Sequence, residues 1–479
     1  MATTTERIAA PEPQPADTRL DPKVIRLVAI LLVGGLAPLF DTTIVNVAIS
    51  TLDHELHAPV ATIQWVITGY LLSLSMMVPL SGWSMNRFGG KQMWMVSLAL
   101  FMVGSVLSGL SWDITSLIIF RVIQGIGGGL MLPILQNLIV QAAGGRALGR
   151  LMSVVSLPAL IGPILGPVLG GIIINSLNWR WIFGVNVPIC IAALILAWFG
   201  MPATQPQRTQ RLDIVGLLLL SPGLAVTLFG LAQVGNANGF GAPQVLIPLG
   251  IGVGLLLAFT IYASFSANPL VDLRLFRYPS LAAASGLLFL SGLTLYGALL
   301  LLPLYFQQAD GQSVLAAGLL LAPQGMGALL TRSWVGSLTD RIGARPIVFA
   351  GIVITALGTI PFALVDAHTN YLILAGALLV RGAGLGAVTI PVMAAAYLGL
   401  QRDEVPHASI AIRVAQQIGG AFGAAVIAII LQQQIAMHNG LALAFGHTFW
   451  WSVGFTLLAI VPTLFLPRIA SKRTGSAAK

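Results

Sequence analysis

The sequence predicts an all-α membrane protein that crosses the bilayer about fourteen times. Of its 479 residues, 57% are hydrophobic and only 8% are charged, whereas a soluble domain carries about a quarter charged residues. Apolar stretches of about twenty residues recur along the chain, and each is long enough to cross a hydrocarbon core of about 30 Å. The two-residue alternation of a membrane β-strand is absent, so each stretch is predicted to be a helix.

The predicted spans divide the chain into segments. They occupy residues 26–50, 61–83, 92–111, 114–140, 149–175, 180–202, 212–234, 243–264, 279–306, 314–338, 345–365, 370–398, 406–432 and 448–467. Residues 1–25 are polar, carry three prolines within a short stretch and lack the pattern of a cleaved signal peptide, so we expect a disordered cytoplasmic tail. Residues 468–479 form a second, basic tail that we also place in the cytoplasm.

Lysine and arginine residues fix the predicted orientation. With a cytoplasmic N-terminus, 19 of the 24 basic residues fall in the tails and loops of the inner side, and Arg180 alone falls outside. The other four, Arg121, Arg332, Arg381 and Arg413, lie inside predicted spans. A missed or added span would invert the downstream loops and destroy this asymmetry, which supports the count of fourteen and an inner (plasma) membrane location.

Several classes of function are excluded by composition. The net charge of +9 lies on the cytoplasmic loops, where it faces anionic membrane lipid and not nucleic acid. The chain has one cysteine, Cys190, and its six histidines are scattered, so neither a disulfide framework nor a metal site is expected. No phosphate-binding loop appears, so we expect no nucleotide, no cofactor and no enzymatic activity.

The chain repeats itself. Residues 82–91, GWSMNRFGGK, follow the second span, and residues 336–345, GSLTDRIGAR, follow the tenth. A second repeat pairs Arg121 and Pro133 with Arg381 and Pro391. Two six-span bundles at 26–202 and 279–467, separated by two extra spans within 203–278, explain these offsets. Secondary transporters are commonly built from such repeats and bind substrate between them.

Asp41 is the one acidic residue well inside a predicted span, roughly 21 Å from its inner end. A carboxylate at this depth is costly unless it is protonated, paired or in contact with water, so we predict a proton carrier. Arg121 in the fourth span lies at a similar depth and is the expected counter-charge, with Gln124 on the same helix face. The alternatives are a fixed structural ion pair and an arginine that only holds spans together.

Other residues are weaker candidates for the substrate cavity. Arg332 and Arg413 lie near the inner surface, where a long side chain reaches water, whereas Arg381 is deeper. Aromatic rings bind lipophilic cations, although tryptophan and tyrosine also collect at membrane interfaces and in cores. With these alternatives open, the candidates for the cavity are Asn46, Trp65, Tyr70, Gln124, Tyr296, Tyr305, Phe306, Gln324 and Arg381.

Four motifs resemble those of a known family. They are residues 40–48 (FDTTIVNVA), residues 121–125 (RVIQG), residues 162–171 (GPILGPVLGG) and residues 178–183 (NWRWIF) followed by NVP at 186–188. Their order is similar to that of the fourteen-span drug:proton antiporters of the major facilitator superfamily, the QacA/EmrB-like group. The resemblance covers nearly the whole chain after the first tail.

The resemblance implies a fold of two six-helix bundles with two extra helices, and it implies roles for motif residues. Asp41 and Arg121 are expected to couple transport to protons. The antiporter motif of span 5, which is thought to favour export, comprises Gly162, Pro163, Gly166, Pro167, Gly170 and Gly171. Gating contacts are expected from Asn86, Arg87, Asp340 and Arg341. Asn86 departs from the acid that is usual there, which weakens the charge lock expected of that loop.

The sequence thus predicts a proton-coupled antiporter that exports lipophilic, often cationic, small molecules by alternating access. Its energy source is the proton gradient, and its expected partners are substrate, protons and membrane lipid. Accessory envelope proteins are an optional further partner, and we expect the protein to be a monomer. Three alternatives stay open. They are an exporter of an endogenous lipid, siderophore or metabolite, a proton-coupled uptake symporter, and a non-transporting membrane sensor or scaffold.

Overall fold

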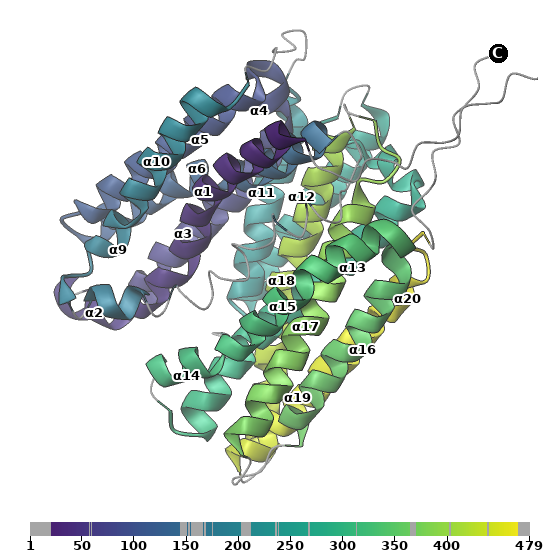
Figure 1. Cartoon of the computed structure of the whole chain (residues 1–479). Coiled ribbons are helices and arrows are strands. Elements are labelled where there is room, and N and C mark those ends of the chain that lie inside the picture. The colour runs from purple at the N-terminus through teal and green to yellow at the C-terminus, as the bar shows by residue number, and fades with distance from the viewer. Residues whose placement is uncertain are drawn as a thin grey trace, which may run out of the picture.

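A computed structural model describes residues 21–143, 151, 154, 166, 169–202 and 212–467, apart from short gaps at 57, 59, 175, 235–236, 238, 267–268, 313, 365–369, 402–403 and 438–439. Within these residues all regular secondary structure is helical. Figure 1 shows the helices of the first half, purple to blue, as one bundle, and those of the last half, green to yellow, as a second.

The helices follow the predicted order. The first half contains α1 (Pro22–Ile44), η1 (Val45–Ala48), α2 (Ile49–Leu56), α3 (Val60–Met77), α4 (Leu80–Phe88), α5 (Gly90–Gly109), α6 (Ile114–Ala143), α9 (Trp181–Gly184) and α10 (Asn186–Gly200). The middle contains α11 (Ile214–Ala232), α12 (Pro243–Phe265) and η2 (Leu273–Arg277). The second half contains α13 (Pro279–Leu304), the π-helical η3 (Tyr305–Ala309), α14 (Val314–Leu320), α15 (Ala322–Ile342), α16 (Ala344–Ala363), α17 (Tyr371–Ala396), α18 (Val405–Met437), α19 (Leu441–Leu458) and α20 (Ile460–Thr463).

Eleven helical stretches of the described residues are long and apolar enough to cross a membrane, and a twelfth forms if α3 and α4, bent by 56°, are one span. α15 is long enough but more polar, because it contains Gln324, Arg332, Asp340 and Arg341. The predicted span 149–175 lies mostly outside the described residues. These two segments account for the difference, so the helices are consistent with the predicted fourteen.

The sequence repeat is also a repeat of backbone geometry. α4 ends at Gly89 with φ 93°, and α15 ends at Gly343 with φ 87°. Each glycine leads directly into the next helix, α5 or α16. Side chains with a Cβ rarely adopt this left-handed conformation, so a glycine is required in both hairpins. We call the end of the molecule that contains these two hairpins, with Arg87, Lys91, Arg341 and Arg345, the basic end.

Apolar packing joins the two bundles at the basic end. One buried cluster includes Leu138 of α6 in the first bundle and Tyr397, Val405 and Ala408, which lie at or beside the ends of α17 and α18 in the second. Gly82 of α4 also lies against α18, because a Cβ at this glycine would be 3.0 Å from the Cβ of Pro406. Farther from the basic end, the buried clusters around Trp179 and around Phe362 each belong to a single bundle.

Glycines set the spacing of the helices within the first bundle. A Cβ at Gly104 would lie 2.5 Å from the backbone of Gln124, and one at Gly127 would lie 2.5 Å from the backbone nitrogen of Phe101. Small residues therefore bring the backbones of α5 and α6 into direct contact, as is usual between membrane helices. This contact fixes the distance from α5 to the polar side chains of α6.

We expect Gly127→Ala to lower the unfolding temperature of the protein in detergent, because the added methyl group meets backbone atoms of α5 that cannot rotate away. Overpacking of this kind costs about 1–3 kcal/mol. Gly254→Ala in α12 is the matched control, since a Cβ there has no described atom within 4 Å and gains about 1 kcal/mol of helix propensity. Equal unfolding temperatures for the two variants would contradict the packing described above.

Candidate functional site

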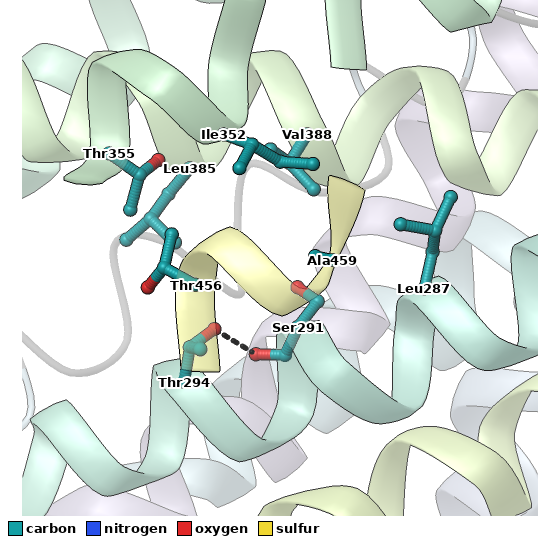
Figure 2. A pocket seen from close by; sticks show the side chains of 9 residues that line it. All are labelled: Leu287, Ser291, Thr294, Ile352, Thr355, Leu385, Val388, Thr456 and Ala459. Atoms are coloured by element: carbon teal, nitrogen blue, oxygen red, sulfur yellow. Dashed lines mark hydrogen bonds between the residues drawn. The ribbon is translucent and has the colours of Figure 1, made fainter. Parts of the chain in front are cut away.

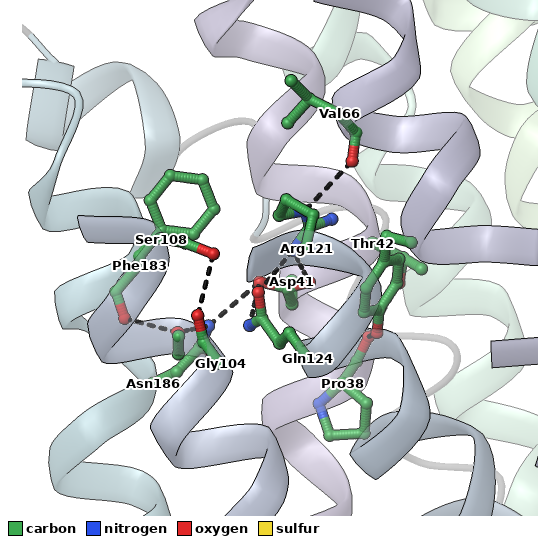
Figure 3. A network of polar contacts seen from close by, with 12 residues as sticks. Pro38, Asp41, Thr42, Val66, Gly104, Ser108, Arg121, Gln124, Phe183 and Asn186 are labelled. Atoms are coloured by element: carbon green, nitrogen blue, oxygen red, sulfur yellow. Dashed lines mark hydrogen bonds and ion pairs between the residues drawn. The ribbon is translucent and has the colours of Figure 1, made fainter. Parts of the chain in front are cut away.

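A buried ion pair lies in the first bundle. Asp41, on α1 one turn after Pro38, is 0% exposed, and Arg121 on α6 is 1% exposed. An Nη1–H of Arg121 donates to Oδ2 of Asp41 at 2.5 Å. Both partners of this ion pair are shielded from solvent. Two residues 80 positions apart in the sequence therefore form one neutral unit between two helices (Figure 3).

Two amide side chains complete the shell around the carboxylate. Gln124 Nε2 donates to Asp41 Oδ1 at 2.9 Å, and Asn186 Nδ2 of α10 donates to the same oxygen at 3.0 Å. Gln124 also accepts a hydrogen bond from Arg121 through its Oε1 at 2.8 Å. The Asp41 carboxylate thus accepts hydrogen bonds from side chains of two further helices, α6 and α10 (Figure 3).

The guanidinium of Arg121 is held from the other side by α3. Its Nε–H donates to the carbonyl oxygen of Val66 at 3.1 Å. Its Cζ lies 4.1 Å from the ring centroid of Tyr70, and the Tyr70 hydroxyl donates to the Pro38 carbonyl at 3.4 Å. A cation over an aromatic face is attracted by the ring, more strongly where water is excluded. Tyr70 therefore packs against the ion pair as well as against α1.

A further contact orients Asn186. The second bond of its Nδ2 goes to the hydroxyl oxygen of Ser105 on α5 at 3.0 Å, and that hydroxyl donates to the carbonyl oxygen of Phe183 at 2.9 Å. Because Ser105 uses its one hydrogen on a carbonyl, it accepts from Asn186. The amide group is thereby fixed with its nitrogen towards Asp41.

All three contacts with Asp41 are donated to the carboxylate, so this arrangement suits an ionised acid. A protonated Asp41 would be neutral and would lose the charge that strengthens these three hydrogen bonds. Removing one partner of a buried ion pair costs about 3–5 kcal/mol, because the remaining charge is uncompensated. The contact between α1 and α6 at this point therefore depends on the charges of both Asp41 and Arg121.

The aromatic candidates lie in different environments. Trp65 is 41% exposed and stacks on Phe229 of α11 with the ring centroids 5.5 Å apart, and Tyr296 is 48% exposed. Tyr305 and Phe306 are instead buried in an aromatic cluster of the second bundle, against Phe362, Phe445 and Phe449. Their rings pack in the core of that bundle, and their place in the substrate cavity stays a prediction.

The polar candidates of the second bundle form a pair. Arg381 of α17 donates through Nη1 to Oε1 of Gln324 on α15. Arg332, also on α15, is buried, and Arg413 of α18 is half-buried with a long contact of 3.4 Å to Gln416. The backbone of Asn46 forms part of η1, and its side chain lies outside the described residues.

The predicted gating residues lie at the basic end. Asn86 and Arg87 at the end of α4 are half-buried, whereas Asp340 and Arg341 at the end of α15 are exposed. Of the antiporter motif, Gly162, Pro163 and Pro167 lie outside the described residues. Gly170 is buried, and a Cβ at Gly171 would meet nothing within 4 Å. Gly166 is packed against α1, because a Cβ there would lie 2.0 Å from Thr43 Oγ1, two residues from Asp41.

A separate cavity of about 20 Å³ lies inside the second bundle (Figure 2). Its polar lining comes from Ser291, Thr294, Thr355 and Thr456. Each of the three threonine hydroxyls donates to a backbone carbonyl of its own helix. The volume holds about one water molecule and is too small for an organic substrate, so we do not assign it to substrate binding.

Two members of the site, Asn186 and Ser105, were not among the residues predicted from the sequence. Asn186 belongs to a segment that carries the family resemblance, but no pattern in the sequence indicates that its amide lies beside Asp41. The one signal is that Asn186 stands at the start of an apolar helix, because a buried amide group needs a hydrogen-bond partner. Ser105 has no comparable signal, because serine is common between membrane helices.

The hydrogen bond from Asn186 to Asp41 predicts an energetic coupling. In a double-mutant cycle of Asn186→Leu and Asp41→Asn, we expect a coupling energy of about 1.5–3 kcal/mol in the free energy of unfolding, the contribution of a hydrogen bond to a charged group. Ser108→Ala with Asp41→Asn is the matched control, since the Ser108 hydroxyl donates to the Gly104 carbonyl instead. Additive effects in the first cycle would show that the two side chains do not interact.

Comparison with known proteins places this site in a family. The Major Facilitator Superfamily model matches residues 31–424 and 284–478. A multidrug resistance protein B homolog of Mycobacterium tuberculosis is 38% identical over 419 residues, 87% of this chain and 78% of that protein. The lincomycin resistance protein LmrB of Bacillus subtilis is 27% identical over 465 residues, 93% of this chain and 96% of that protein.

Solved structures agree with the fold. The crystal structure of the human organic anion transporter MFSD10 covers 93% of this chain and 100% of its own, with a TM-score of 0.63 and 17% identity. The structure of the proton:xylose symporter XylE covers 91% of this chain and 96% of its own, with a TM-score of 0.61 and 16% identity. These similarities confirm the resemblance predicted from the four sequence motifs: the chain belongs to the major facilitator superfamily, and its relatives include multidrug resistance proteins.

Proposed function

We propose that this protein is a proton-driven antiporter that exports lipophilic, often cationic, small molecules across the plasma membrane by alternating access. The observation that carries the proposal is the fully buried Asp41, held by Arg121 and two amide groups inside a transmembrane bundle. The names of its relatives, a multidrug resistance protein and a lincomycin resistance protein, support the export of drug-like molecules.

The ion pair supplies a mechanism for exchange. A proton on Asp41 neutralises the carboxylate and removes its attraction for Arg121, so α1 and α6 become free to shift. A cationic substrate has the opposite effect, because it favours the ionised carboxylate. Proton and cation therefore compete for Asp41, because each favours a different ionisation state of its carboxyl group. With one carboxylate in the first bundle's core, exchange of one monovalent cation for one proton moves no net charge.

The packing between the bundles supports alternating access. The apolar contacts that join the two bundles lie at the basic end, around Tyr397, Val405 and Gly82. Positive loops face the cytoplasm in membrane proteins, so we assign the basic end to the cytoplasmic side. In this assignment the bundles are closed towards the cytoplasm, and rocking about the site would break these contacts and open the inner side.

Neutralising Asp41 tests the mechanism. In proteoliposomes with an imposed pH gradient, we expect Asp41→Asn to lose uphill transport of a lipophilic cation such as tetraphenylphosphonium, because asparagine cannot bind and release a proton. Asp21→Asn is the matched control, since Asp21 caps the start of α1 by accepting from the Lys23 amide and asparagine caps helices equally well. Uphill transport by Asp41→Asn at the rate of the control would overturn the proposal.

A disulfide across the basic end tests alternating access. The Cβ atoms of a Gly82→Cys and Pro406→Cys pair would start 3.0 Å apart, and a small helix shift brings them into the range of about 3.5–4.5 Å that a disulfide requires. We expect oxidation of this pair to stop transport and reduction to restore it. Cys190 is buried, so the two single-cysteine variants serve as controls. Unchanged transport by the oxidised double variant would contradict the rocking motion.

A further inference from the structure

The second bundle holds buried positive charge for which the described part of the chain gives no acidic partner. Arg332 of α15 and Arg381 of α17 are both buried. The helices α13, α14 and α16 to α19 contain no aspartate or glutamate, and α15 contains Asp340 near its end at the basic end. An arginine keeps its charge in a protein, and a buried uncompensated charge costs several kcal/mol. The bundle therefore favours an anion from elsewhere.

Arg381 is the arginine with the most defined surroundings. It is 2% exposed, and glycines bring two helices against it. A Cβ at Gly358 of α16 would lie 2.4 Å from the Arg381 backbone nitrogen, and one at Gly382 would overlap the Gln324 backbone of α15. Among the described residues its guanidinium has one hydrogen-bond acceptor, Gln324 Oε1, for five N–H donors. The backbone at Arg381 is thus closely packed, and Gln324 is the one acceptor for its guanidinium among the described residues.

The internal repeat identifies what is absent from this position. Arg121 in α6 and Arg381 in α17 occupy matching places in the two halves, each followed by a proline ten to twelve residues later, at Pro133 and Pro391. Arg121 binds a glutamine oxygen and the Asp41 carboxylate. Arg381 binds a glutamine oxygen, and α13, which matches α1, has no acidic residue. The second site thus pairs its arginine with a glutamine from another helix, α15, and the structure gives it no carboxylate among the described residues.

Arg332 adds to the positive potential of the same bundle. It is 7% exposed, and both of its terminal nitrogens are buried without a hydrogen-bond partner. It follows Gln324 by eight residues on α15, which corresponds to about 12 Å along the helix axis. Two buried guanidinium groups on adjacent helices, α15 and α17, therefore raise the affinity of this region for a negative group.

We propose that Arg381, with Gln324, binds the carboxylate of a transported amphiphile, so that zwitterionic or acidic molecules are substrates as well as cations. The proposal rests on the proposed transport function. A carboxylate accepts two parallel N–H···O bonds from a guanidinium, which a chloride ion cannot do. A zwitterion exchanged for one proton carries net positive charge inward, so its export also draws on the membrane potential.

A matched pair of dyes tests this site. Rhodamine 6G is a cationic ethyl ester, and rhodamine 19 is the free carboxylic acid of the same ring system. We expect the purified wild-type protein, in a buffer free of chloride and of carboxylates, to bind the acid at least about tenfold more tightly than the ester, as measured by fluorescence anisotropy. In Arg381→Gln the ratio of the two dissociation constants should fall to about one. In Arg413→Gln, the control, the ratio should stay at its wild-type value.

Arg381→Lys keeps the positive charge but loses the two parallel N–H donors of the guanidinium, so the ratio of the two dissociation constants should fall to a few-fold. This variant provides a test even if Arg381→Gln does not fold. Equal affinities for the two dyes in the wild-type protein, or a ratio unaffected by either change at Arg381, would overturn the proposal. Displacement of both dyes by chloride with equal effect would assign the site to chloride and also overturn it.

Transport assays separate this proposal from the proposed function. If the wild-type protein drives both dyes uphill with a pH gradient but the acid preference does not depend on Arg381, the anion site is wrong and the antiporter stands. If the acid preference depends on Arg381 and neither dye is driven by a pH gradient, the anion site stands and the proton-driven mechanism fails.

Discussion

A charge buried in a membrane protein must be compensated by groups from neighbouring helices, and the first bundle is organised by this constraint. Asp41 is enclosed by Arg121 and Gln124 of α6 and by Asn186 of α10, while α3 holds Arg121 through the Val66 carbonyl. Four helices thus share one polar network in an apolar environment. Since none of these groups can leave its partners without cost, the positions of the helices and the ionisation of Asp41 are coupled.

Close packing makes this network possible. Glycines at 104 and 127 bring α5 and α6 into backbone contact, and Gly166 approaches Thr43 beside Asp41. The hydroxyl of Ser105 on α5 then accepts a hydrogen bond from Asn186, so α5 orients the amide that donates to Asp41. The same glycines that allow the helices to pack closely therefore also set the geometry of the polar site.

Much of the fold and part of the site could be predicted from the sequence. Helix-length apolar stretches and the repeat at 82–91 and 336–345 predict two bundles, and a charge inside an apolar stretch singles out Asp41 and Arg121. Asn186 was not predicted because its contact with Asp41 depends on how α10 packs against α1. An aromatic residue at the end of a span suits a bundle core as well as a cavity. The packing of Tyr305 against Phe362, Phe445 and Phe449 could not be predicted, because these rings come from distant parts of the sequence.

The two bundles share a backbone plan but differ in charge. In the first, the arginine of the fourth span is neutralised by a carboxylate of the same bundle. In the second, the matching arginine has a glutamine as its acceptor. The first bundle therefore supplies the counter-charge of its own arginine, whereas the structure gives Arg381 no such partner among the described residues. With the two proposed sites, a substrate that has a cationic and an anionic end would fit both bundles in only one orientation.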